Sequence, residues 1–342
     1  MNTSITRRHA LGLVAAAPAL LCEPSSARTG AVDETGFARI GGIDQWIGIQ
    51  GRDLRNPVML YLHGGPGEAQ SPFLEEFVPW ETDFTVVNWD QRGSGRTYGK
   101  NGPSTPGMST PETALDRLSE DAREVAEYAR KRLSKQKIIL VGQSWGAELG
   151  LHVVKRWPEL FYAFVGTGQP VSWHLKIEGQ ERWAREQATA SGDQETLKAL
   201  SDTASLAESD RRRIMASGKY RMAPSDLEYV KIFNAFIGPP PPPAQGDVAD
   251  WIAGSRFTGA KVAPIEFSLD ARKLGLDFPL PFFVIQGRED HIAPFEVAQA
   301  YVAEVRAPKK AFIPIAGGHW ACFTNATAFL EALRQQVRPL AT

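Results

Sequence analysis

A serine flanked by glycines is the first feature of the sequence with a clear chemical use. The segment GQSWG (residues 142–146) matches the G-x-S-x-G pattern, in which a serine occupies a sharp turn between a strand and a helix. An apolar run (residues 137–141) precedes the segment and a helical pattern follows it, so the required context is present. A helix N-terminus behind the serine favours developing negative charge. We therefore predict that Ser144 is a nucleophile.

A serine hydroxyl needs a base to take its proton and a third group to orient that base. Asp290 and His319 each follow an apolar run that is typical of a strand. Because the carboxyl ends of parallel strands meet at one edge of a sheet, we expect these residues to converge on Ser144. The sequence predicts a triad of Ser144, Asp290 and His319. Asp290 is preferred to Glu289 as the acid because it directly precedes the segment HIAP (residues 291–294).

A glycine-rich loop, HGGPG (residues 63–67), follows another predicted strand. Such a loop can turn backbone N–H groups toward a nucleophile, and we predict an oxyanion hole formed by the N–H groups of Gly65 and Trp145. A simple tight turn is the alternative. We expect His63 to support the loop by hydrogen bonding. Neither a P-loop nor a dinucleotide fingerprint is present, so the loop is not predicted to bind phosphate.

Short apolar runs alternate with helical patterns along most of the chain. This alternation predicts an α/β fold with a mainly parallel central sheet and helices on both faces. Residues 37–51 indicate a β-hairpin around two glycines. The other expected strands cover residues 57–62, 84–89, 137–141, 163–166, 281–286 and 311–315, and the clearest helices cover 113–134 and 144–156.

The interval 170–275 departs from this alternation. It is polar and rich in helical patterns, and it contains a run of prolines at residues 239–243 that can continue neither a helix nor a central strand. We interpret the proline run as a stiff connection, with a proline-rich recognition motif as the alternative. The sequence thus predicts a helical cap (170–275) inserted between two parts of a core domain (28–169 and 276–342).

Residues 1–27 have the pattern of an export signal. Arg7 and Arg8 precede an apolar run (residues 10–21) and then a stretch of small residues, which is typical of the bacterial twin-arginine route to the periplasm. The apolar run is shorter than the ~20 residues needed for a stable membrane span. The alternatives are a buried N-terminal helix or a tail, which would leave the protein in the cytoplasm, and a lipid attachment site at Cys22.

The composition narrows the range of partners. The 342 residues include 38 Lys and Arg against 39 Asp and Glu, a formal net charge of −1 that does not favour nucleic acid. The histidines, cysteines and carboxylates show no metal-ligand spacing, so we predict no metal. Once the signal is removed, Cys322 is the one remaining cysteine and is expected to be a buried thiol. The expected partner is a small molecule or a short peptide, and the oligomeric state is left open.

Five segments together carry a family resemblance: HGGPG (63–67), WDQRGSGRT (89–97), GQSWG (142–146), GRED (287–290) and GGHW (317–320). In these segments the chain resembles the proline iminopeptidase family of serine aminopeptidases. The resemblance implies an α/β-hydrolase core with a helical cap and no cofactor. It also implies release of N-terminal residues, often proline, from short peptides. Ser144, Asp290 and His319 fall on the family's triad positions, and Gly65 and Trp145 on its oxyanion positions.

The resemblance fades in the cap, where the family binds the substrate's free amino terminus through carboxylates. The Trp-Glu-Gly segment that supplies one of them is missing here. Glu178 and Glu181 are the nearest acidic candidates for substrate binding, and solvated charges on a helix face are the alternative reading of both.

Two enzymatic readings therefore stand. An aminopeptidase would place a cap carboxylate facing Ser144. A carboxylesterase or related acyl hydrolase acting on small esters, amides or lactones would instead have an apolar pocket, with natural lining by Trp145, Trp173, Trp320 and Phe323. A hydrolase scaffold reused for binding is the non-enzymatic alternative.

Overall fold

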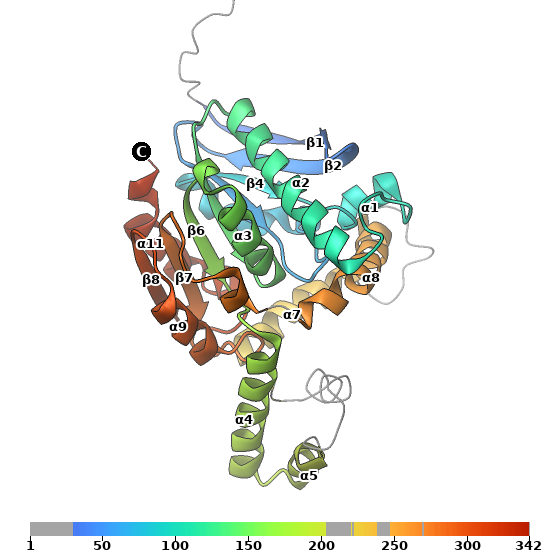
Figure 1. Ribbon diagram of the computed structural model, residues 1–342, viewed down its shortest axis with the longest axis vertical. Coiled ribbons are helices and arrows are strands. Elements are labelled where there is room, and N and C mark those ends of the chain that lie inside the picture. Colours follow the sequence, from blue (N-terminus) through green and yellow to red (C-terminus); the bar gives the residue numbers. More distant parts are fainter. Residues whose placement is uncertain (1–29, 203–219, 221, 238–246, 269, 342) are drawn as a thin grey trace, which may run out of the picture.

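The computed structural model describes residues 30–202, 220, 222–237, 247–268 and 270–341 (Figure 1). The predicted export signal (1–27), Cys22 and the proline run (239–243) lie outside the described residues, so those interpretations stay predictions. The predicted domain boundaries also stay predictions.

The described chain forms one sheet of eight strands in the order β1-β2-β4-β3-β5-β6-β7-β8. The hairpin of β1 and β2 is antiparallel and joins β4 in antiparallel register, whereas β3 to β8 are mutually parallel. The predicted α/β class with a mainly parallel sheet is confirmed. The strands are β1 (Val32–Ile40), β2 (Ile43–Gly51), β3 (Val58–Leu62), β4 (Thr85–Trp89), β5 (Ile138–Gln143), β6 (Phe161–Thr167), β7 (Phe282–Gly287) and β8 (Lys310–Ile315).

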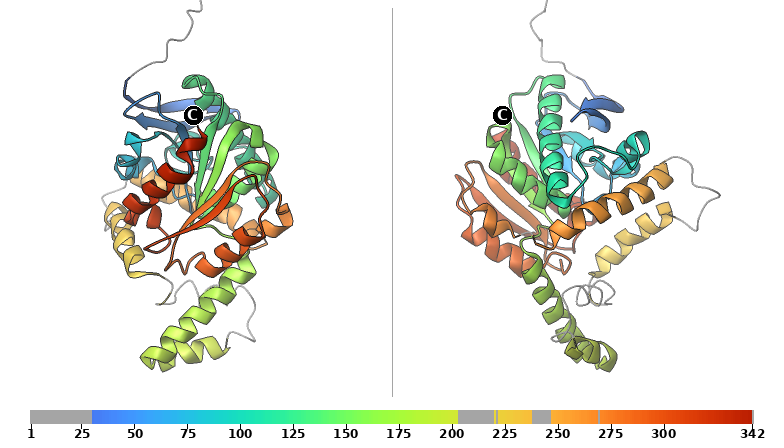
Figure 2. Two further views of the ribbon diagram at one scale, coloured as in Figure 1. Left: turned by 90° about the vertical axis from the view of Figure 1, so that its left-hand side faces the viewer. Right: turned by 45° about the vertical axis from the view of Figure 1, so that its right-hand side comes forward.

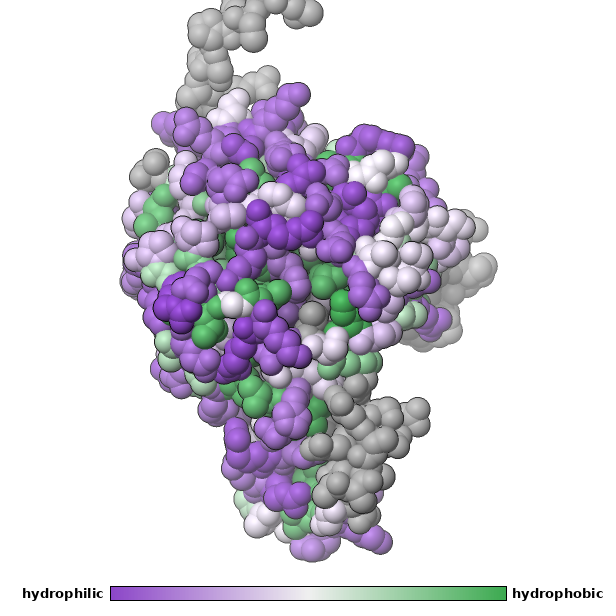
Figure 3. Space-filling model, in the orientation of Figure 1, coloured by the Kyte–Doolittle hydropathy of each residue, from purple (hydrophilic) through white to green (hydrophobic). Residues whose placement is uncertain are grey.

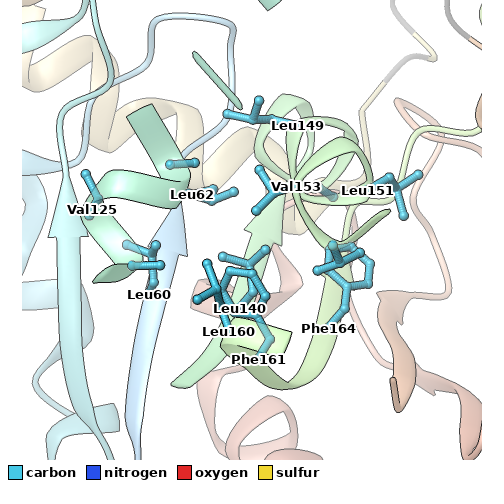
Figure 4. Close-up of a cluster of buried hydrophobic side chains, with 14 of the residues drawn as sticks. Leu60, Leu62, Val125, Leu140, Leu149, Leu151, Val153, Leu160, Phe161 and Phe164 are labelled. Atoms are coloured by element: carbon cyan, nitrogen blue, oxygen red, sulfur yellow. The ribbon is translucent and has the colours of Figure 1, made fainter. Parts of the chain in front are cut away.

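Both faces of the sheet are buried because successive side chains of a strand point to opposite sides. Leu60 and Leu62 of β3 join a cluster with Val125 and Leu149 from the helices on one face (Figure 4). Tyr61, between them, joins a second cluster with Phe329 on the other face. Continuous apolar runs such as VMLYL are thus explained by burial on two sides.

Helices cover both faces of this sheet (Figure 2). Outside the interval between β6 and β7, they are α1 (Gly95–Asn101), α2 (Pro111–Arg132), α3 (Trp145–Arg156), α9 (Phe295–Glu304), α10 (Ala321–Thr324) and α11 (Ala326–Gln336). The helix α2 begins with Thr110 in a capping box and Pro111 at its first position. Short 3₁₀ turns are η1 (Ser71–Phe77), η2 (Trp80–Thr82), η3 (Pro158–Leu160), η5 (Ala271–Leu274) and η6 (Arg338–Leu340).

Four further described helices lie between β6 and β7, where the sequence predicts a cap. They are α4 (Trp173–Ser191), α5 (Gln194–Asp202), α7 (Pro224–Ile237) and α8 (Asp247–Glu266). The helix α4 extends away from the sheet and carries α5 at its far end, whereas α7 and α8 lie against the body of the molecule (Figures 1 and 2). The cap therefore contacts the core mainly through α7, α8 and the start of α4.

The outer surface over α2 is largely hydrophilic (Figure 3). Among the described residues, no helix combines the length and the apolar composition that crossing a membrane requires.

Candidate active site

The turn that holds Ser144 is the most constrained point of the backbone. Ser144 has φ 51° and ψ −120°, a conformation that a residue with a side chain rarely adopts, and α3 begins directly after it. Its N–H donates to the carbonyl of Thr167 at the end of β6, with an N···O distance of 2.9 Å. The strained turn is thereby tied to the neighbouring strand and presents the serine at the carboxyl edge of the sheet.

The two glycines of GQSWG permit close backbone contacts. A Cβ atom on Gly142 would overlap the carbonyl of Gly146, and a Cβ on Gly146 would overlap the carbonyl of Leu62 at the end of β3. The first contact lets α3 turn back over β5, and the second lets α3 approach β3. Both glycines are therefore required by packing.

Asp290 and His319 meet as the sequence predicts. Nδ1 of His319 lies 3.0 Å from each carboxylate oxygen of Asp290, which is fully buried. One of these oxygens also accepts the N–H groups of Ile292 and Ala293, at 3.0 and 2.8 Å. Since Asp290 is held by its own loop, it fixes the imidazole without moving. The carboxylate that pairs with His319 is therefore that of Asp290, as predicted, and not that of Glu289.

This pairing defines the chemistry of the imidazole. A carboxylate accepts, so Nδ1 carries the proton and Nε2 is left as a proton acceptor. The ring packs against Gly168, where a Cβ atom would lie 2.8 Å from the ring carbon Cε1. Gly168 directly follows Thr167, the partner of the Ser144 N–H. In the described structure no hydrogen bond joins the Ser144 hydroxyl to His319, and such bonds often tighten only when substrate is bound.

The loop HGGPG supplies the second half of the predicted oxyanion hole. Gly65 has φ 113°, which favours glycine, and a Cβ there would crowd the next backbone N–H groups. Within the described part of the chain, neither the Gly65 N–H nor the Trp145 N–H donates a hydrogen bond to another group. Two backbone donors that are not used within this part of the chain fit the predicted role, which stays a prediction.

His63 supports this loop, as expected. Its Nδ1 lies 2.9 Å from the carbonyl of Gly64, and its Nε2 accepts the N–H of Gln91 at 3.1 Å. Burial lowers the pKa of His63 to about 4, so the ring is neutral and fits one donor and one acceptor role. The side chain of Gln91 donates to the His63 carbonyl and accepts from the Trp145 indole. Gln91 thus links the segment WDQRGSGRT to His63 and to the Trp145 side chain.

The acidic candidates on α4 have different surroundings. Glu178 is exposed and pairs with His174 of the same helix at 3.0 Å, whereas Glu181 is partly buried. The middle of α4 contacts the Asp290 loop, since Gln180 donates to the carbonyl of Ile292 at 3.0 Å. Farther along, Trp183 stacks on His291 with ring centroids 3.9 Å apart. The cap therefore supports the loop that carries the acid.

The helix α7 brings a second carboxylate to the loop that carries His319. Sequence reasoning did not identify it. Asp226 is fully buried and accepts the backbone N–H groups of His319 and Trp320, at 2.9 and 3.2 Å. Burial raises its pKa, an effect opposed by the hydrogen bond from His319. No motif marks Asp226, and an acidic residue in the first turn of a helix has a commonplace local explanation.

A third carboxylate, the partly buried Glu76 of η1, faces the same helix. Tyr229 of α7 donates its hydroxyl to Glu76, with an O···O distance of 2.6 Å. Burial raises the pKa of Glu76 to about 7. The Tyr229 ring stacks on Trp320 and Phe323, with centroid distances of 5.5 and 5.6 Å, so α7 presents aromatic and acidic groups beside His319.

Comparison with known proteins places the chain in a family. The sequence profile described as alpha/beta hydrolase fold matches residues 57–326. The chain belongs to the alpha/beta hydrolase fold family.

Relatives of this hydrolase include proteins named as peptidases. It is 27% identical over 288 residues to a probable aminopeptidase, YbaC, of Bacillus subtilis, which covers 79% of this chain and 85% of the relative. It is 28% identical over 180 residues to a proline iminopeptidase of Lacticaseibacillus rhamnosus, covering 51% and 53% of the two chains. A solved proline iminopeptidase-related protein from Thermus thermophilus shares the fold, with a TM-score of 0.62 and 20% identity over 91% of this chain and 99% of that one.

The structure also tests the predictions made for Cys322 and for the side chain of Trp145. Cys322 is a buried free thiol, as expected, and burial raises its pKa. The side chain of Trp145 is 1% exposed and donates to Gln91, so it belongs to the core and does not line an open pocket. Among the described residues, no three His, Cys, Asp or Glu side chains are grouped as a metal ion would need.

Proposed function

We propose that the chain is a serine hydrolase that works through an acyl-enzyme. The pairing of His319 with both oxygens of Asp290 is the observation that carries this proposal, because it leaves Nε2 free to take a proton. As the Ser144 oxygen attacks the substrate carbonyl, His319 accepts the hydroxyl proton and then delivers it to the leaving amine or alcohol. Water repeats the sequence on the acyl-enzyme and releases the acid. The N–H groups of Gly65 and Trp145 stabilise the oxyanion in both steps.

The substrate class that we propose is a short peptide with a free N-terminus. A relative that spans most of this chain is named a probable aminopeptidase, and this supports the proposal. An ammonium group near the reacting carbonyl needs a carboxylate. Glu181 is the better of the two candidates on α4, since its side chain is partly buried while that of Glu178 is exposed. Glu178 stays a weaker candidate.

An acyl hydrolase that accepts small esters is the second candidate function. It is favoured by the aromatic group beside His319, in which Trp320 and Phe323 stack on Tyr229. Such rings suit an apolar acyl chain better than a peptide ammonium. We propose that Trp320 contacts the substrate under both functions.

Turnover by the purified protein separates the two functions. We would compare prolyl and alanyl naphthylamides, free and N-acetylated, with p-nitrophenyl acetate and butyrate. Cleavage of the free naphthylamides alone supports an aminopeptidase, and cleavage of the esters alone supports the second candidate. Ser144→Ala is expected to lower either activity by ~10⁶-fold while leaving the fold intact. Full activity in that variant would refute the mechanism itself.

A further inference from the structure

Three consecutive N–H groups of the His319 loop are held by the cap. Besides the two bonds to Asp226, the N–H of Gly318 donates to the hydroxyl of Ser225 at 3.2 Å. Both acceptors lie in the first turn of α7. An acidic residue at such a position ordinarily serves the N–H groups of its own helix. Here the carboxylate serves a loop 93 residues away in the sequence.

The fit between Asp226 and this loop is close. A Cβ atom on Gly318 would overlap the Asp226 carboxylate, and all three of its nearest atoms belong to that residue. Asp226 is fully buried, so its bonds are not diluted by competition with water. The close approach of the Asp226 side chain therefore explains why residue 318 is a glycine.

The loop needs such support because of its composition. Gly317, at φ 115°, and Gly318 precede His319 and have no side chains with which to anchor the backbone. Hydrogen bonds from outside the loop must then fix the peptide units that carry the imidazole. Asp290 fixes the ring at Nδ1, and the turn of α7 fixes the backbone at the N–H groups.

We propose that Asp226 is a positioning residue for the catalytic histidine, through which the cap becomes part of the hydrolytic apparatus. The inference rests on the proposed function of Ser144 and His319. Asp226 acts on the backbone of His319 and does not bind substrate. With it removed, the ring samples positions from which Nε2 does not meet the Ser144 hydroxyl, and a displacement of about 1 Å can cost ~100-fold in rate.

The test measures how fast a small fluorophosphonate labels Ser144. This reagent needs an activated serine but carries no ammonium, so the labelling rate reports on His319 and not on amine recognition. Asp226→Asn keeps the size of the side chain but replaces one acceptor oxygen by an NH₂ group that cannot accept a loop N–H. We expect labelling of folded protein to slow by about 10- to 100-fold.

The pH profile of labelling gives a second readout. The carboxylates that face the His319 ring are Asp290, from the loop after β7, and Asp226, from α7. Since Asp226→Asn removes one negative charge near an imidazolium, the acid limb of the profile should move to lower pH. A purely structural role would lower the thermal midpoint without moving this limb.

Matched variants complete the experiment. Glu228→Gln removes a charge from an exposed position of the same helix and should change neither readout. Ser225→Ala removes one of the three bonds without a charge change, so it should slow labelling less than Asp226→Asn does. Gly318→Ala should slow labelling in the native chain by displacing the carboxylate, and much less in an Asp226→Ala background.

The outcomes separate the two proposals. If the unmodified protein is not labelled at Ser144, the proposed function is wrong and this inference with it. If it is labelled and Asp226→Asn is labelled equally fast with the same pH profile, only the inference is wrong. If Asp226→Asn loses naphthylamide turnover but is labelled at the normal rate, Asp226 binds substrate. That result also overturns the positioning role. Should Asp226→Asn not fold, Ser225→Ala and Gly318→Ala carry the same comparison.

Discussion

The surroundings of His319 show how far single residues can be interpreted from sequence. Asp290 was predictable because it follows a strand in a recognisable segment, and the structure pairs it with the imidazole. Asp226 was not predictable, since its partner lies 93 residues away and its helix carries no motif. Motifs report what a residue does within its own loop. They do not report which distant element comes to rest on that loop.

Glu76 offers a prediction about stability and pH. Burial raises the pKa of this carboxyl from its ordinary value of 4.5 to about 7, while the hydrogen bond from Tyr229 opposes the shift. The folded state therefore binds the proton more tightly than the unfolded state, and the stability that this proton contributes is lost as the pH rises from about 4.5 to about 7. Glu76→Gln does not titrate. Its free energy of unfolding should rise relative to the parent over that interval, by up to about 3 kcal/mol.

Chemical denaturation at several pH values between 4 and 8 measures this difference. The glutamine oxygen can still accept the Tyr229 hydroxyl, so the variant isolates the charge. Glu75→Gln, at the exposed neighbouring position, is the matched control and should track the parent at every pH. Parallel stability curves for Glu76→Gln and the parent would show that Glu76 has an ordinary titration in the folded state.

At the scale of elements, the helices and strands with continuous apolar or periodic patterns were well predicted. All eight strands were expected from sequence, and α2 (Pro111–Arg132) agrees with the periodic segment 113–134 to within two residues at each end. The short elements α1 and η1 were missed. They lie in segments whose glycine and proline content predicts turns, and they are stabilised by contacts such as the bonds from Ser71 to the buried carboxylate of Asp90.

The junction of β5 and α3 makes a prediction at this scale. Gly146→Ala would place a methyl carbon in overlap with the carbonyl oxygen of Leu62, the last residue of β3, and this backbone cannot shift without disturbing the paired strand. We expect a loss of several kcal/mol, on the order of ~3 or more, seen as a large fall in the denaturation midpoint.

A second glycine serves as the control for this variant. Gly259 lies inside α8 with open space where a Cβ would sit, so Gly259→Ala should be neutral or stabilise the fold by up to about 1 kcal/mol. Equal effects of the two substitutions would mean that helix propensity, and not the crossing of α3 over β3, decides the cost at Gly146.

At the scale of the whole molecule, the fold class was easier to predict than the strand order or the contacts between distant elements. Alternating strands and helices indicated the α/β class, which the structure confirms, but not that β4 lies between β2 and β3. Strand order depends on how the connections cross the sheet, and this involves contacts between distant segments. For the same reason, the sequence indicated cap helices without indicating that α7 would rest on the His319 loop.

The last prediction concerns export of the protein to the periplasm. Arg7 and Arg8 precede an apolar run too short to span a membrane stably, and we propose that residues 1–27 are a twin-arginine signal for export into the periplasm. In a bacterium with that pathway, the parent chain should be shortened by about the length of residues 1–27 and recovered from the periplasm. Replacing both arginines by lysine keeps the charge but removes the guanidinium pair, and should leave full-length, active enzyme in the cytoplasm. A chain that starts at residue 28 is the control for activity without export. Recovery of unshortened parent protein from the cytoplasm would instead favour an N-terminal helix or tail that stays with the fold.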